Sequence, residues 1–128
     1  MDKRFLEIIP CTQAGYHPLV YFDGWRVAFL NDTPKFHREN VHEMQRHTTS
    51  DEVFLLLNGS CTLYTGDGKG KDAGNITSTP MVPLCLYNIK AGVWHTHITA
   101  PGTTLAIIEN ADVSSDNTDT AFVVLPDK

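Results

Sequence analysis

Residues 47–59, with the sequence HTTSDEVFLLLNG, decide the fold of this chain. After a histidine and a short polar run, Glu52 begins an apolar segment that contains valine, phenylalanine and leucine. Such a segment predicts a β-strand over residues 52–57, and the Asn58-Gly59 dipeptide that follows it is typical of a tight turn. We therefore expect a hairpin in which this strand pairs with the next one, over residues 60–65.

Short apolar runs of the same kind fill most of the remaining sequence. Turn residues separate them, and Asp23-Gly24 predicts a further hairpin. The best helical candidate, residues 34–40, is short and polar, and a polar, glycine-rich loop covers residues 66–75. Many short strands without long helices indicate an all-β sandwich or barrel, which we expect to form one domain over residues 1–128. The other strands are expected at residues 20–22, 25–30, 41–47, 84–89, 94–98, 103–109 and 121–125.

The composition argues against several classes of function. The 128 residues carry a formal net charge of −5 with both signs interspersed, so we expect neither nucleic acid nor an anionic membrane as a partner. No apolar run approaches the roughly 20 residues of a membrane-spanning helix, and the first residues do not resemble a secretory signal. The cysteines Cys11, Cys61 and Cys85 are widely spaced, and we expect them to be reduced and mostly buried in a cytoplasmic protein.

Side chains that can bind a metal recur with the period of a β-strand. Successive side chains of a strand alternate between its two faces, so Gln45 and His47 share one face, as do His95 and His97 on a later strand. If these faces line one barrel together with Glu52, the side chains could converge. Two imidazoles and a carboxylate form a set suited to iron(II), manganese or zinc, with positions left open for water or substrate.

Two stretches resemble the signatures of the cupin superfamily. The first signature has a histidine, four residues, a glutamate, six residues and a glycine, and His47, Glu52 and Gly59 meet these spacings. The second has a glycine, two residues and a histidine, as Gly92 and His95 do. The resemblance lies within the central part of the chain. It implies a double-stranded β-helix of the jelly-roll type, frequently dimeric, with a metal in the barrel mouth.

The resemblance also implies which residues bind the metal. The ligand set would be Gln45, His47, Glu52 and His95, and the ion iron, manganese, nickel or zinc. Gln45 stands where cupins commonly have a histidine, and its amide oxygen is a poorer donor for a first-row metal than imidazole. Within residues 39–99 other signature positions differ too: Glu39 and Leu84 replace glycine, Lys90 replaces proline and Thr99 replaces asparagine.

Each of these polar side chains also has a structural interpretation. His47 and His95 could be hydrogen-bonded histidines of a metal-free pocket, and Glu52 could form a salt bridge with a neighbouring strand or face solvent. His97 is either an orienting or acid–base group or a polar lining residue. Glu109 ends an apolar strand, where we expect a solvated carboxylate.

Two main classes of function remain open. As an enzyme, the protein would use the metal to polarise an oxygen atom or to activate oxygen, with His97 or Glu52 as the candidates for moving a proton. Isomerase, lyase or dioxygenase chemistry on a small sugar-like or keto-acid molecule would fit. Alternatively, the barrel binds a small ligand without metal, as a sensor, carrier or accessory subunit; a storage-like or structural role is a third interpretation.

One expected strand is apolar on both faces. Val53, Leu55 and Leu57 lie on the face opposite Glu52, and a strand of this kind is usually covered on both sides. The second sheet can cover one face and a partner subunit the other. We therefore expect a homodimer.

Overall fold

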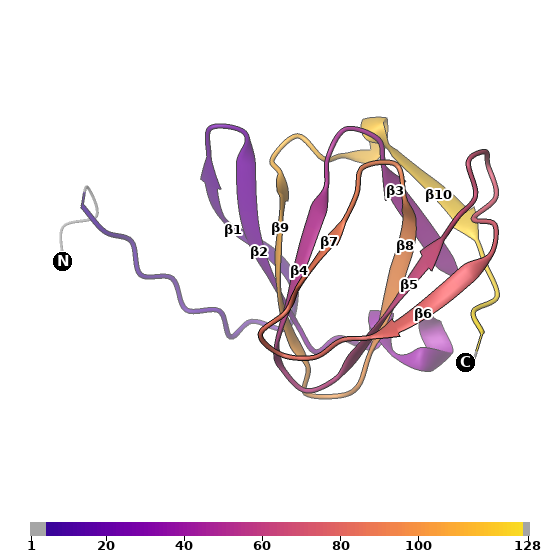
Figure 1. The fold of residues 1–128 in the computed structure, drawn as a ribbon. Coiled ribbons are helices and arrows are strands. Elements are labelled where there is room, and N and C mark those ends of the chain that lie inside the picture. Colours follow the sequence, from indigo (N-terminus) through magenta and orange to yellow (C-terminus); the bar gives the residue numbers. More distant parts are fainter. Residues whose placement is uncertain (1–4, 127–128) are drawn as a thin grey trace.

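The computed structural model describes residues 5–126 and shows two antiparallel β-sheets that face each other as a barrel (Figure 1). Strands dominate this part of the chain, and its only helices are three single turns of 3-10 helix, none of them long or apolar enough to cross a membrane. The expected all-β jelly-roll fold is confirmed, and a single domain over residues 1–128 stays a prediction. The elements are β1 (Gly15–Phe22), β2 (Trp25–Asn31), η1 (Pro34–Phe36), η2 (Arg38–Asn40), β3 (Glu43–His47), β4 (Glu52–Asn58), β5 (Cys61–Gly66), β6 (Ile76–Pro80), β7 (Leu86–Ile89), β8 (Trp94–Thr99), β9 (Thr104–Asn110), η3 (Ser115–Asn117) and β10 (Thr118–Phe122).

Strands that are distant in sequence lie side by side in both sheets. One sheet has the order β1-β2-β9-β4-β7 and the other the order β10-β3-β8-β5-β6. Consecutive strands β3 and β4 therefore belong to opposite sheets, as do β8 and β9. This alternation brings residues from both sheets to the space between them.

The core follows from the alternation of side chains along the strands. In β4, Phe54 and Leu56 point inward with Glu52 and are almost fully buried. They pack in one cluster with residues of β2 and β9, among them Leu30 and Leu105. A second cluster covers the other face of β8, whose six residues are all buried. The central strand β8 is thus buried on both faces.

The two Gly-containing turns behave differently. Asp23 and Gly24 both have positive φ, at 43° and 102°, and join β1 and β2 in the expected hairpin. The hairpin expected at Asn58-Gly59 is wrong, because β4 pairs with β9 and β7, whereas β5 pairs with β8 and β6. Gly59 instead carries the chain from one sheet to the other. Thr103 secures this crossing, since its Oγ1 donates to the Ser60 carbonyl at 2.9 Å.

Several other expectations need correction. Strand β6 was not expected, because its sequence ITSTP is polar and lies at a sheet edge. The strand expected from residue 84 begins only at Leu86, since Leu84 has a φ of 65°, outside the range of a strand. The three cysteines are unpaired, but only Cys61 is buried; Cys11 is half-buried and Cys85 is exposed.

Candidate metal centre

Three buried side chains from three strands meet at one end of the space between the sheets. His47 ends β3, Glu52 begins β4 and His95 lies in β8. Oε1 of Glu52 is 2.8 Å from Nε2 of His95 and 3.2 Å from Nε2 of His47. One ligand atom of each residue lies within 4.8 Å of those of the other two, so the three side chains could hold a metal ion.

The pairing of the strands explains why these side chains meet. In β8, His95 and His97 point into the barrel, whereas Trp94 on the alternate face packs in the second cluster. In the neighbouring sheet, Glu52 of β4 lies directly opposite Glu109 of β9. Two carboxylates on adjacent inward positions concentrate negative charge beside the imidazoles.

Each site histidine is oriented through its second ring nitrogen. Nδ1 of His47 is 2.9 Å from the hydroxyl oxygen of Thr118, and Nδ1 of His95 is 3.0 Å from the carbonyl oxygen of Val93. Since a carbonyl oxygen only accepts, Nδ1 of His95 carries the proton and Nε2 faces Glu52. Two acceptors at 2.8 Å require a proton or a metal ion between them. The donor set therefore fits a divalent cation.

The metal-free cluster behaves as a buried ion pair. Burial raises the pKa of Glu52, but hydrogen bonds with His47 and His95 lower it more, to about 2. Burial lowers the pKa of His95. Its hydrogen bond to Glu52 and the charge of that carboxylate together outweigh this effect, so the pKa of His95 lies above its ordinary value. A proton on His95 thus occupies the place that a metal ion would take.

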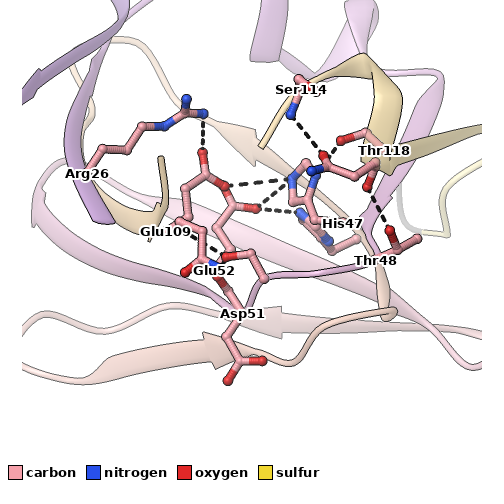
Figure 2. Close-up of polar contacts among 12 residues, drawn as sticks. Arg26, His47, Thr48, Asp51, Glu52, Glu109, Ser114 and Thr118 are labelled. Atoms are coloured by element: carbon pink, nitrogen blue, oxygen red, sulfur yellow. Dashed lines mark hydrogen bonds and ion pairs between the residues drawn. The ribbon is translucent and has the colours of Figure 1, made fainter. Parts of the chain in front are cut away.

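Glu109 corrects the expectation of a solvated carboxylate at the end of a strand. Its side chain is only 3% exposed and forms an ion pair with Arg26, whose Nη2 lies 2.7 Å from Oε1 (Figure 2). The hydroxyl group of Tyr16 donates to the same oxygen at 3.0 Å. Burial and then the charge of Glu109 raise the pKa of Tyr16, which keeps this phenol protonated. Sequence reasoning missed Arg26 and Tyr16, although period two from Leu105 does place Glu109 on an inward face.

The site opens into a cavity with a volume of about 830 Å³. The cavity is lined by the three residues of the metal centre, by Glu109 and Arg26, and by apolar residues of the inner faces of the sheets. Polar groups at one place and apolar walls elsewhere are typical of a site for a small molecule.

Comparison with known proteins identifies the architecture. No family model matches the chain, and no curated protein matches its sequence. A cupin-2 domain protein from Shewanella frigidimarina matches with a TM-score of 0.56 and 17% identity, over 77% of this chain and 83% of its own. The chain has the cupin fold.

Two enzymes share the cupin fold with this chain at similar distances. A TDP-quinovose 3,4-ketoisomerase from Campylobacter jejuni matches with a TM-score of 0.58 and 21% identity, over 73% of this chain and 68% of its own. Oxalate decarboxylase from Bacillus subtilis matches with a TM-score of 0.53 and 16% identity, over 74% of this chain. This chain spans only 23% of the decarboxylase chain. At such identities the likeness concerns the fold.

Two other candidate residues, Gln45 and His97, line the same cavity. Gln45 is the partner of His95 in the pairing of β3 with β8, and it lines the cavity, although it is exposed. Its role as a metal ligand stays a prediction. His97 is buried between the rings of Phe36 and Phe54, at centroid distances of 4.2 and 5.5 Å. Burial lowers the pKa of His97 to about 4, so its ring is neutral at neutral pH.

Proposed function

We propose that this protein binds one divalent metal ion through His47, Glu52 and His95, with the amide oxygen of Gln45 as a fourth ligand. The observation that carries this proposal is that one ligand atom each of His47, Glu52 and His95 lies within 4.8 Å of the other two, in a buried site. Iron, manganese, nickel and zinc all accept such a mixed set of ligands.

We further propose that the loaded site acts on a small polar molecule in the cavity. The metal would supply Lewis-acid stabilisation of an oxygen atom, or a site for oxygen activation. His97 and Glu52 are the candidates for moving a proton. The named activities of two neighbours, an oxalate decarboxylase and a TDP-quinovose 3,4-ketoisomerase, favour lyase or isomerase chemistry on a small acid or sugar-like substrate. Dioxygenase chemistry on a keto-acid is the other reaction that such a metal site would allow.

A second candidate function is supported by the same cluster. The carboxylate of Glu52 accepts from both imidazoles, so the three side chains satisfy one another when His95 carries a proton. Together with Gln45 in place of a histidine, this arrangement favours a cupin that binds a small ligand without metal, as a sensor, carrier or accessory subunit.

Metal content decides between the two candidates. The wild type and the His47→Ala/His95→Ala double variant would be purified without tag or chelator and analysed by mass spectrometry. About one equivalent of iron, manganese, nickel or zinc in the wild type, lost in the variant, supports the metal site. The absence of metal from both proteins, even after reloading with each ion, rejects it and favours the metal-free pocket.

We also propose a homodimer that resides in the cytoplasm. The support for a dimer is the outer face of the sheet that contains β4, where Leu57 of β4, Leu86 of β7 and Ile108 of β9 are 47%, 69% and 37% exposed. A continuous apolar face of this kind on one sheet is typical of a protein interface. Unpaired cysteines favour a reducing compartment.

A further inference from the structure

Glu109 is a buried carboxylate that uses only one of its two oxygens. Oε1 accepts hydrogen bonds from Nη2 of Arg26 and from the hydroxyl group of Tyr16. Oε2 is buried and has no hydrogen-bond partner among the described residues. It lies 3.9 Å from Nε2 of His47, on the side of the metal centre (Figure 2).

An unused buried acceptor is costly, so its position needs an explanation. A buried oxygen without a donor loses its interaction with water and gains nothing in exchange. Arg26 offsets the negative charge of Glu109, and with Tyr16 it holds the carboxylate in a fixed orientation. The structure thus keeps Oε2 turned toward the metal centre instead of satisfying it.

No side chain of the metal centre can supply the missing donor. Glu52, the cross-strand neighbour of Glu109, only accepts when it is ionised. Nε2 of His47 is already 3.2 Å from Glu52 and would bind the metal in the loaded site. Glu109 is also not one of the residues whose ligand atoms all lie within 4.8 Å of one another. Its free oxygen therefore lies beside the metal set without belonging to it.

We propose that Oε2 of Glu109 accepts a hydrogen bond from a hydroxyl group of the ligand, and so selects ligands that carry a hydroxyl group next to their metal-binding oxygen. This inference rests on the proposed metal site. A 2-hydroxy acid has the required arrangement, since its carboxylate can bind the metal while its hydroxyl group points to a neighbouring acceptor. Glu109 lines the same cavity as the three residues of the metal centre, so a ligand on the metal would lie beside this carboxylate.

The test compares two small probes on the metal-loaded protein. Glycolate carries the hydroxyl group, and methoxyacetate carries a methyl ether at the same position, which cannot donate. Calorimetric titration of the manganese-loaded wild type should show glycolate binding at least about tenfold more tightly, the range of a hydrogen bond to a charged group. Failure of glycolate to bind at millimolar concentration, or equal affinities for the two probes, overturns the inference.

The substitution Glu109→Gln should remove this preference. Because Arg26 and Tyr16 both donate to one oxygen, the introduced amide would place its oxygen there and turn its NH₂ group to the cavity. An acceptor is thus exchanged for a donor of the same shape, and we expect the preference for glycolate to fall to unity or to reverse. Glu43→Gln removes the same charge from an exposed residue that lines the same cavity, and it should keep the preference.

Two controls separate this inference from its foundation. The first control is the manganese content of each protein: if the wild type binds no metal, the proposed metal site has failed. If all proteins bind manganese but Glu109→Gln and Glu43→Gln show the same preference for glycolate, only the role of Glu109 is overturned. If Glu109→Gln unfolds, Glu109→Asp keeps the charge beside Arg26 while it withdraws the oxygen by one methylene group. This variant should also lose the preference, and an unchanged preference overturns the inference.

Discussion

Gln45 is the ligand position at which a single substitution should strengthen the site. Imidazole is a better donor than an amide oxygen for zinc and its first-row neighbours, and Gln45 lies opposite His95 in the sheet. We expect Gln45→His to raise the affinity for zinc by about tenfold or more, in a competition titration against a chelating indicator. The matched control is Glu43→His, on the same face of β3 but two residues further from the centre. An equal gain in both variants would contradict the role of Gln45.

The pair of Glu52 and His95 should make the stability of the metal-free protein depend on pH. The pKa of Glu52 is lowered from 4.5 to about 2, so its contribution is present above pH 4.5 and lost as the pH falls toward 2. The pKa of His95 is raised above 6.5, so its contribution is full below pH 6.5 and lost as the pH rises through the raised value. The contribution of the pair to the free energy of unfolding is therefore largest between about pH 4.5 and 6.5.

The control for this prediction must separate His95 from His97. The pKa of His97 is lowered to about 4, so its burial destabilises the protein as the pH falls below 6.5, in the opposite sense. The measured quantity is therefore the difference in urea midpoint between the wild type and His95→Gln, across the pH range. Bound metal should reverse the trend, because protons compete with it for the imidazole. A difference that does not change with pH would show that the pair is not ionised.

The cluster of His47, Glu52 and His95 was predictable, and its surroundings were not. The alternation along the strands indicated which side chains share a face. The resemblance to cupins implied that Glu52 and His95, 43 residues apart in sequence, meet in one barrel mouth. The anchor of Glu109 comes from Arg26 and Tyr16, which lie 83 and 93 residues away in sequence. Contacts of this range depend on the order of strands in the sheet, which no local pattern contains.

At the scale of the elements, Gly59 should be more sensitive to substitution than Gly102. Its φ is 84°, and an added Cβ would lie 2.4 Å from Oγ1 and 2.7 Å from Cα of Thr103. Gly102 has nearly the same φ, 81°, but nothing within 4 Å of an added Cβ. We expect Gly102→Ala to cost about 1 kcal/mol through its backbone alone. Gly59→Ala should cost roughly 2 kcal/mol or more, because the clash adds to the strain.

Urea unfolding of the two glycine variants measures this difference directly. Equal destabilisation would mean that Thr103 moves aside easily and that it does not secure the crossing between the sheets.

Of the two turns predicted from a dipeptide that ends in glycine, one formed the expected hairpin and the other did not. Asp23-Gly24 joins strands that pair locally, whereas the strands beside Gly59 find partners elsewhere in the chain. A turn dipeptide predicts a change of direction, and distant strands determine whether a hairpin results.

At the scale of the whole molecule, the two sheets differ in how their outer faces are covered. The outer face of the sheet with β3 and β8 is covered by the second cluster, which includes Val123 and Leu125 from the chain beyond β10. The opposite sheet has an outer face with exposed leucines, and no part of residues 5–126 buries Leu57 or Leu86. The cavity lies between the sheets, so a partner on this outer face would leave the site accessible.

The dimer proposal predicts that this outer face holds two copies together. A stable interface buries about 800 Å² on each partner, which needs a broad apolar face of this kind. We expect the wild type to have the mass of a dimer by light scattering at micromolar concentration, and Leu57→Lys/Leu86→Lys to be a monomer, because two buried cations on each copy would lack partners. The control is Phe122→Lys, which alters an even more accessible apolar residue, 76% exposed, on the other sheet and should leave the dimer intact. A monomeric wild type would refute the dimer, and a dimer that resists the double substitution would move the interface to another face.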